Sequence, residues 1–337
     1  MVEGLISQSD AVQQAVDRFQ KNRISEYGLL GHDMGIHDFN LMLGGWIPKK
    51  VTTIAGRSGM GKTALITPMI DAGEKVINGR RAEFMFCSWE MSADYIVDRL
   101  VCYRTGLSSL MLNQGAKLLS EARYKEVQKA FLEAKKSPVH YQPMSTDINT
   151  IRIMFTEFVE ECKKKSKIEG VEIIPVCIVD YIGMAQFDSA GLRTYGIGDF
   201  MNGAKQIANN TGGAFCILAQ INRTADDKAI PQKSDLSDSQ SIENASDNLV
   251  IAHRPEYNHV PTIKDPNTSE EVDSRGKMFI RVAKGRDFGT GDTLIKCSMK
   301  NYRFWSMNHD FDYDYRELYS KKDFWLNHFG LDKGVEF

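Results

Sequence analysis

The sequence lacks a large excess of charge of either sign. Its 337 residues carry a formal net charge of -2, so any basic surface for a nucleic-acid partner must be local, as in a pore or a groove. It also lacks the basic N-terminal stretch of a secretion signal and any apolar run long enough to span a bilayer. We therefore expect a soluble, cytoplasmic protein with no membrane partner.

Cysteine is scarce and scattered. The six cysteines are Cys87, Cys102, Cys162, Cys177, Cys216 and Cys297. They form no Cys-x-x-Cys pair and are not grouped with histidines, and several fall within apolar runs. The pattern favours buried thiols in a reducing compartment over disulfides or a zinc site.

Short apolar runs alternate with segments of helical periodicity, which is typical of an α/β protein. Hydrophobic residues make up 42% of the chain, enough for a large core in one domain or two. The predicted strands are residues 51–54, 84–88, 176–180, 214–219, 248–253, 278–283 and 294–299. The predicted helices are residues 9–23, 93–104, 116–136 and 147–165. We expect a mostly parallel central sheet flanked by helices, preceded by an amphipathic N-terminal helix.

The segment after the first strand fits the pattern of Gly, four residues, then Gly-Lys-Thr. Its residues are Gly56, Arg57, Ser58, Gly59, Met60, Gly61, Lys62 and Thr63. Glycines let such a loop wrap around phosphates, so that its amide groups and the following helix N-terminus face anionic oxygens. Lys62 would reach the β- and γ-phosphates, and the Thr63 hydroxyl would help to hold Mg²⁺. The strand, loop and helix order favours a nucleoside triphosphate site over a chance turn.

Three polar side chains end predicted strands, at the edge of an open α/β sheet where ligands bind. Glu90 is a candidate for orienting and deprotonating an attacking water, with a solvated residue at the start of the next helix as the alternative. Asp180 ends an apolar strand in the Walker B form, whose carboxylate binds Mg²⁺ through water. Gln220 is placed to contact the γ-phosphate or its water and to report hydrolysis.

Two polar segments are candidates for gripping a single nucleic-acid strand. Residues 183–198 are glycine-rich and contain Arg193 and Tyr195, so we expect a mobile loop that contacts phosphates and stacks on bases. A plain surface loop is the alternative. Residues 224–247 form a second long polar segment, with Lys228 and Lys233.

A basic turn joins the last two predicted strands. Lys284 and Arg286 lie at alternate positions on it, so their side chains should project from the same side and suit phosphates across a subunit boundary. An exposed basic turn is the alternative. The stretch from His309 mixes aromatics with acids and is either an interaction tail or a strand extension.

Taken in order, these motifs resemble those of the RecA-type motor domain of the DnaB class of ring-shaped replicative helicases, found in bacteria and their phages. The resemblance covers about Gly35 to Trp305. The matching segments are residues 35–40 before the first strand, the P-loop at 55–63, the catalytic glutamate segment at 88–92, the Walker B strand at 178–181 and the sensor motif at 218–223.

The resemblance implies a domain layout. Residues 1–30 would form a linker helix that docks on a neighbouring subunit, residues 31–308 the RecA-like motor domain, and residues 309–337 a C-terminal aromatic and acidic tail. We expect a compact, phage-like version without the family's N-terminal collar domain, with primase or a helicase loader as a further partner.

The resemblance also implies a mechanism. Copies of the chain, six by analogy with the family, would form a ring around single-stranded DNA, hydrolyse ATP with Mg²⁺ and unwind duplex from 5′ to 3′. Arg286 would act as an arginine finger, with Lys284 beside it, toward the ATP of the neighbouring subunit. A RecA-like recombinase filament and an ATP-gated DNA-binding scaffold or loader ring are the alternatives.

One departure from the family concerns DNA contact. The family's DNA-gripping loop carries an Arg-Glu-Ser-Gly run, whereas this chain has Leu-Ser-Asp-Ser-Gln at residues 236–240. Without that arginine, the segment would hold phosphates only through backbone amides or neutral side chains, and cations elsewhere would compensate. The candidate DNA-binding residues are therefore Arg193, Lys228, Lys233, Ser237, Asp238 and Gln240.

Overall fold

The computed structural model describes residues 6–23, 28–187, 193–221, 230–232, 235 and 239–328. The chain divides into two compact units, one formed by Gly31–Phe311 and the other by the described parts of Met1–Leu30 and Asp312–Phe337.

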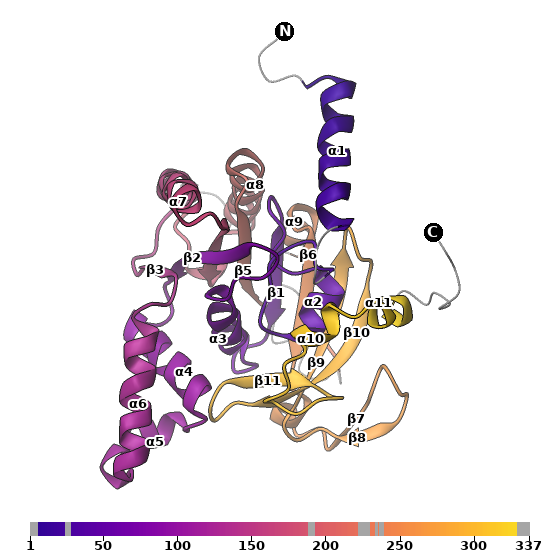
Figure 1. Cartoon of the computed structure of the whole chain (residues 1–337). Coiled ribbons are helices and arrows are strands. Elements are labelled where there is room, and N and C mark those ends of the chain that lie inside the picture. Colours follow the sequence, from indigo (N-terminus) through magenta and orange to yellow (C-terminus); the bar gives the residue numbers. More distant parts are fainter. Residues whose placement is uncertain are drawn as a thin grey trace. The chain divides into compact units, whose positions relative to one another are not determined.

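A nine-stranded sheet forms the centre of the larger unit, in the order β11-β10-β9-β6-β1-β5-β4-β2-β3 (Figure 1). Its strands are β1 (Val51–Gly56), β2 (Arg80–Ser88), β3 (Val139–Gln142), β4 (Glu172–Asp180), β5 (Ala214–Gln220), β6 (Asn248–His253), β9 (Lys277–Gly285), β10 (Gly291–Ser298) and β11 (Arg303–Ser306). From β6 to β3 every neighbouring pair is parallel, whereas β6, β9, β10 and β11 pair antiparallel. The predicted α/β class with a mostly parallel sheet is confirmed.

Helices cover both faces of the sheet. They are α2 (His37–Leu43), α3 (Lys62–Gly73), α4 (Ala93–Thr105), α5 (Ser109–Asn113), α6 (Glu121–Ala134), α7 (Ile148–Glu169), α8 (Arg193–Thr211) and α9 (Ser239–Ala245), with short 3-10 turns η1 (Ala116–Leu118), η2 (Ile182–Met184) and η5 (Pro255–Asn258). The small antiparallel pair β7 (Thr262–Lys264) and β8 (Glu271–Asp273) lies outside the main sheet.

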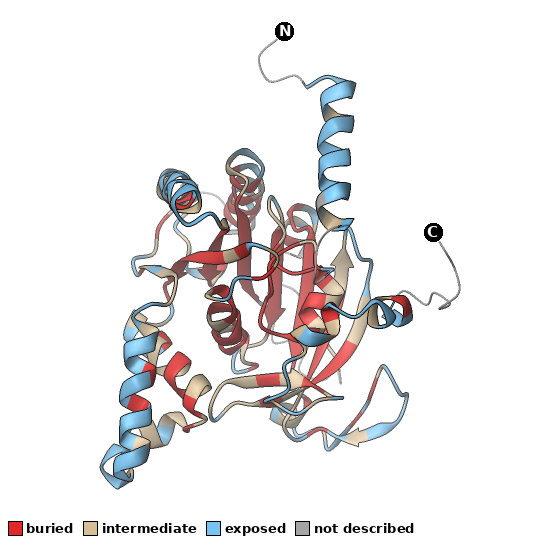
Figure 2. Cartoon of the chain, viewed as in Figure 1, coloured by how far each residue is buried: buried red, intermediate tan, exposed pale blue. Residues whose placement is uncertain are grey.

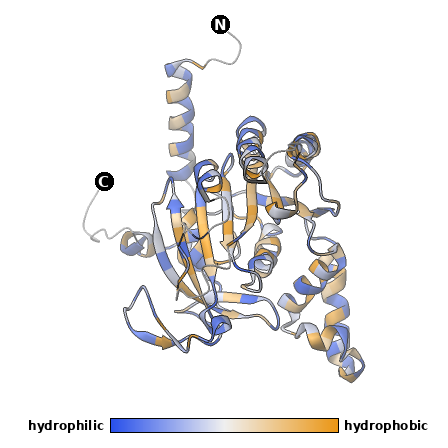
Figure 3. Cartoon of the chain, turned by 180° about the vertical axis from the view of Figure 1, so that it is seen from behind, coloured by the Kyte–Doolittle hydropathy of each residue, from blue (hydrophilic) through white to orange (hydrophobic). Residues whose placement is uncertain are grey.

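Alternation along the strands divides the core between the two faces, because successive side chains of a strand point to opposite sides. In β4, Val176 and Ile178 join the core under α2, α3 and α4. The alternate residues Cys177 and Val179 join the core under α7, α8 and α9. Burial on both faces explains the continuous apolar runs of these strands, which appear buried in Figure 2 and hydrophobic in Figure 3.

All six cysteine side chains are buried thiols, as the sequence predicts. No helix in the described part of the chain combines the length and hydropathy needed to cross a membrane.

The smaller unit contains α1 (Gln8–Arg23), α10 (Arg316–Tyr319) and α11 (Lys322–His328). The chain at Gly28 passes against the indole of Trp325: a Cβ built there would lie 2.5 Å from the ring, and φ of 60° also favours glycine. Helix α1 has the predicted apolar stripe, and its Val12, Val16 and Phe19 are 50%, 39% and 68% exposed. Docking of this stripe on a neighbouring subunit stays a prediction.

Two expectations about local structure are wrong. Residues 193–198 are not part of a mobile loop but the first turns of α8, and Ile197 is buried there because the helix needs an apolar face toward β5. The predicted helix over 116–136 is broken after η1, because Ser120 caps a new helix by accepting a hydrogen bond from the amide of Arg123 at 3.4 Å.

Candidate active site

The P-loop lies between β1 and α3, in the place that the sequence predicts. Gly59 and Gly61 have φ values of 80° and 92°, in the region that only glycine adopts readily. A Cβ at Gly61 would also lie 2.8 Å from the Met299 side chain. The loop therefore needs glycine at both positions, and it delivers the chain into the first turn of α3, whose N-terminal amides suit an anion.

Lys62 opens α3 and points back into the loop. Its Nζ donates to the carbonyl oxygens of Gly56 at 2.9 Å and Arg57 at 3.0 Å. Burial lowers the pKa of Lys62, while the carboxylates of Asp180 and Glu90 act in the opposite direction. The ammonium group is thus held at the centre of the loop by two backbone carbonyl oxygens.

Asp180 lies at the end of β4, next to the start of α3. Its Oδ2 accepts a hydrogen bond from the Thr63 hydroxyl at 2.7 Å, and the side chain is almost fully buried. Burial raises the pKa of Asp180 to about 6. Its Oδ1 is buried and has no hydrogen-bond partner among the described residues.

These two side chains fit a magnesium ion. Mg²⁺ prefers oxygen donors, and it is commonly held by one or two protein oxygens, water and substrate phosphates. The Thr63 hydroxyl and the Asp180 carboxylate supply such oxygens beside the P-loop, and the buried, unbonded Oδ1 would be available to the ion as a further ligand.

Glu90 follows β2, which pairs with β4 so that Ser88 lies opposite Asp180. The amide of Trp89 donates to the Asp180 carbonyl at 3.0 Å, and its indole Nε1 donates to Gln142 Oε1 at 2.7 Å. The buried tryptophan fixes the chain, and the next residue, Glu90, is exposed within electrostatic range of Lys62 and Asp180.

Gln220 ends β5, which lies between β1 and β4 in the sheet. It pairs in register with Gly56, the first glycine of the P-loop, and its side chain is exposed. The structure therefore brings Lys62, Thr63, Glu90, Asp180 and Gln220 to one edge of the sheet, where the carboxyl ends of the parallel strands meet.

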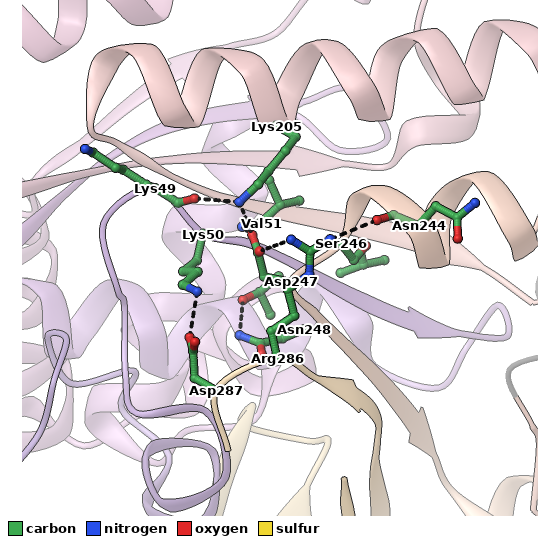
Figure 4. A network of polar contacts seen from close by, with 12 residues as sticks. Lys49, Lys50, Val51, Lys205, Asn244, Ser246, Asp247, Asn248, Arg286 and Asp287 are labelled. Atoms are coloured by element: carbon green, nitrogen blue, oxygen red, sulfur yellow. Dashed lines mark hydrogen bonds and ion pairs between the residues drawn. The ribbon is translucent and has the colours of Figure 1, made fainter. Parts of the chain in front are cut away.

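The basic hairpin lies at the opposite end of the parallel strands, where β1 and β6 begin. Lys284 Nζ donates to the carbonyl oxygen of Glu243, and Arg286 Nη2 donates to that of Asn244 at 3.3 Å, so both side chains reach the end of α9. Arg286 Nη1 also lies 3.3 Å from Asp247 Oδ1 (Figure 4). The backbone amide of Arg286 donates to the Asp247 carbonyl, next to the start of β6.

The candidate DNA-binding residues are only partly described. Arg193 begins α8, and Gln240 is exposed on α9. The other four, Lys228, Lys233, Ser237 and Asp238, lie outside the described residues. Contact of all six with DNA stays a prediction.

A group of side chains after β6 was missed by the sequence reasoning. Tyr257 lies against the P-loop, since a Cβ at Gly59 would be 2.6 Å from its hydroxyl. The Arg254 guanidinium lies 5.9 Å from the centre of the Tyr257 ring, and Arg57 donates to Asn258 Oδ1 at 3.4 Å. The sequence carries no local signal for this group, because Tyr257 reaches the ligand edge only through the parallel pairing of β6 with β1, which directs the chain leaving β6 past that edge.

The fold and this edge define a RecA-like α/β domain with a P-loop at the carboxyl ends of its parallel strands. The family described as "DnaB-like helicase C terminal domain" matches residues 31–306. The chain therefore belongs to the DnaB-like helicase C-terminal domain family.

Individual relatives agree with this assignment. The chain is similar to the replicative DNA helicase DnaB of Rickettsia bellii, with 27% identity over 274 residues, 76% of this chain and 51% of that protein. It is also similar to a probable plasmid replicative DNA helicase of Chlamydia trachomatis, with 28% identity over 205 residues, 60% of this chain and 42% of that protein. The chain thus spans about half the length of these relatives.

Solved structures show the same fold. An ATPase domain of known structure superposes with a TM-score of 0.74 at 18% identity, covering 89% of this chain and 99% of that domain. A DnaB-like replicative helicase, solved in a study of its interactions with primase, gives a TM-score of 0.70 at 18% identity, covering 90% of this chain and 67% of that one.

Proposed function

We propose that this protein is an ATP-driven DNA helicase motor that assembles as a homo-oligomeric ring, a hexamer by analogy with its family, around single-stranded DNA. The family membership and the arrangement of the P-loop edge support ATP hydrolysis. A cytoplasmic location, travel from 5′ to 3′ and contact with primase or a loader extend the same proposal.

Each residue at the P-loop edge has a role in this proposal. The P-loop amides and Lys62 hold the phosphates, and Thr63 with Asp180 holds Mg²⁺, which neutralises charge on the phosphates when bound. Glu90 orients the attacking water and accepts its proton. Gln220, beside the first P-loop glycine, contacts the γ-phosphate or that water.

The position of Arg286 carries the oligomeric part of the proposal. Strands β1 and β6 are parallel with Thr52 opposite Asn248, and β9 places Gly285 opposite Asn248. Arg286 therefore lies near the start of β1, whereas the P-loop begins at the end of β1. The five residue steps between Val51 and Gly56 correspond to about 16 Å.

An arginine side chain does not span that distance, and this one is tied to Asp247 and Asn244 at its own edge. Arg286 is therefore unable to serve the P-loop of its own subunit, and it is suited to reach a nucleotide held by a neighbour. An arginine finger placed in this way contributes about a thousandfold or more to the hydrolysis rate, so a lone subunit should hydrolyse ATP poorly.

Tyr257 and Arg254 extend the site beyond the phosphates. An exposed aromatic ring beside the P-loop, with a guanidinium over its face, offers a stacking surface for a purine base. We assign base binding to Tyr257 on this ground.

Unwinding of a forked DNA duplex by the purified protein, with ATP and Mg²⁺, tests the proposed function. Closed rings that separate the strands from a 5′ tail are the expected result. Filaments that hydrolyse ATP without separating strands would favour a recombinase, and rings that do so would favour a scaffold or loader.

A further inference from the structure

A buried carboxylate joins the basic hairpin to the rest of the motor domain. Asp247 lies between α9 and β6, and it is only 1% exposed. Its Oδ2 accepts hydrogen bonds from Lys205 Nζ at 2.6 Å and from the amide of Val51 at 2.8 Å, while Oδ1 faces Arg286 Nη1 at 3.3 Å (Figure 4). Backbone bonds add to the junction, because the Asp247 amide donates to Val51 and its carbonyl accepts from Arg286.

The charges of this junction do not cancel. The single carboxylate of Asp247 faces two cations, Lys205 and Arg286. The three groups together therefore carry one positive charge, which can attract an anion. A buried carboxylate is stable only with such partners. The two cations therefore stabilise the charged Asp247, and Asp247 in turn holds both cations in place.

The contacts fix one side of the Arg286 guanidinium and leave the other at the surface. Asp247 and the Asn244 carbonyl hold Nη1 and Nη2, yet the arginine side chain is 47% exposed. A long side chain without these contacts would sample many rotamers, and a displacement of about 1 Å in a catalytic group can cost about a hundredfold in rate.

Two of the groups that contact Asp247 or Arg286 come from helices next to the predicted DNA-contacting segments. Lys205 is on α8, which begins at Arg193. Asn244 is on α9, which follows the polar segment after β5. Helices are stiff elements, so a shift at either segment would reach the junction as a movement of Lys205 or of the α9 carbonyls.

We infer that Asp247 is a positioning residue for Arg286: together with Lys205 it sets the pose in which the finger meets the neighbouring subunit's ATP. The inference rests on the proposed function, since it acts only through the finger. It assigns to Asp247 no contact with nucleotide or DNA.

The test compares Asp247→Asn with Asp287→Asn in the full chain. Both remove one negative charge next to Arg286, but the Asp287 carboxylate pairs with Lys50 at 2.7 Å and is 39% exposed. We expect Asp247→Asn to lower the kcat of single-strand-stimulated ATP hydrolysis by about a hundredfold, with KM for ATP changed less than about twofold. Asp287→Asn should leave both constants within about twofold.

A double-mutant cycle separates positioning from general destabilisation. In an Arg286→Ala background, Asp247→Asn should cause no further loss of kcat, because the group that it positions is already gone. If Asp247→Asn does not fold, as judged by its thermal melting, Lys205→Gln serves as the second variant, with a smaller loss of kcat and the same unchanged KM expected.

The outcomes distinguish the inference from the proposed function. An unchanged kcat in a folded Asp247 or Lys205 variant, or a loss of kcat that persists in the Arg286→Ala background, would overturn the positioning role while leaving the helicase proposal intact. A wild-type protein without DNA-stimulated hydrolysis, or an Arg286→Ala variant with full turnover, would overturn the proposed finger and with it the inference.

Discussion

Replacing Asp180 with asparagine should remove a pH-dependent destabilisation of the nucleotide-free protein while abolishing Mg²⁺-dependent hydrolysis. Burial raises the pKa of this carboxyl from 3.8 to about 6, so the folded chain binds its proton more tightly than the unfolded chain does. The cost of burying the charged form is absent below about pH 4 and complete above about pH 7. Stability contributed by Asp180 therefore falls as the pH rises through that window.

The magnitude follows from the shift. About two pKa units, at 1.36 kcal/mol each, correspond to roughly 3 kcal/mol at neutral pH. Asparagine introduces its own cost by leaving an amide nitrogen buried where Oδ1 now lies, but that cost does not depend on pH. The pH-dependent part of the difference between the two proteins therefore isolates the carboxylate.

Urea denaturation of both proteins in EDTA, at intervals from pH 4 to pH 8, measures this difference. The free energy of unfolding of Asp180→Asn minus that of the wild type should increase by about 2.5 kcal/mol across the series, because about 0.5 of the roughly 3 kcal/mol is already present at pH 4. Excess Mg²⁺ should stabilise the wild type, by about 1.4 kcal/mol at ten times Kd, and the variant less. A difference that is constant with pH would refute the reasoning from burial, and equal stabilisation by Mg²⁺ would remove Asp180 from the metal site.

Other predictions concern hydrolysis and assembly. Arg286→Ala should lower DNA-stimulated kcat by about a thousandfold and leave ATP binding largely intact; unchanged turnover would contradict the finger role. Glu90→Gln should lower kcat by about a hundredfold or more and trap ATP-bound rings, so rapid hydrolysis would exclude Glu90 as the base. Tyr257→Ala should raise KM for ATP by about fivefold, with Tyr257→Phe close to wild type, as expected for stacking of about 1 kcal/mol; equal effects of both would contradict stacking. Deleting residues 1–24 should weaken assembly as measured by light scattering, and undisturbed rings would exclude docking by α1.

Much of the sheet and its ligand edge could be predicted from the sequence, because short-range rules govern them. A continuous apolar, β-branched run identifies β4, and a strand that ends in Asp180 after a P-loop has few other structural meanings. Gly59 and Gly61 of the P-loop are required by their positive φ values, which the sequence pattern already implies.

Long-range packing decided what the sequence did not predict. The helical start of α8 depends on the burial of Ile197 in the core beside β5. A glycine-rich stretch of sequence gives no sign of that contact. Tyr257 lies beside the P-loop only because β6 pairs with β1. The role of Asp247 needs three elements far apart in the chain to meet.

The most direct test of the account mixes two variants that are each inactive. Glu90→Gln subunits carry an intact finger and no base, whereas Arg286→Ala subunits carry an intact base and no finger. In rings of randomly mixed subunits, about a quarter of the interfaces combine an intact base with an intact finger. Single-strand-stimulated ATP hydrolysis should therefore reappear on mixing. A rate no higher than the sum of the two separate variants would contradict hydrolysis between subunits.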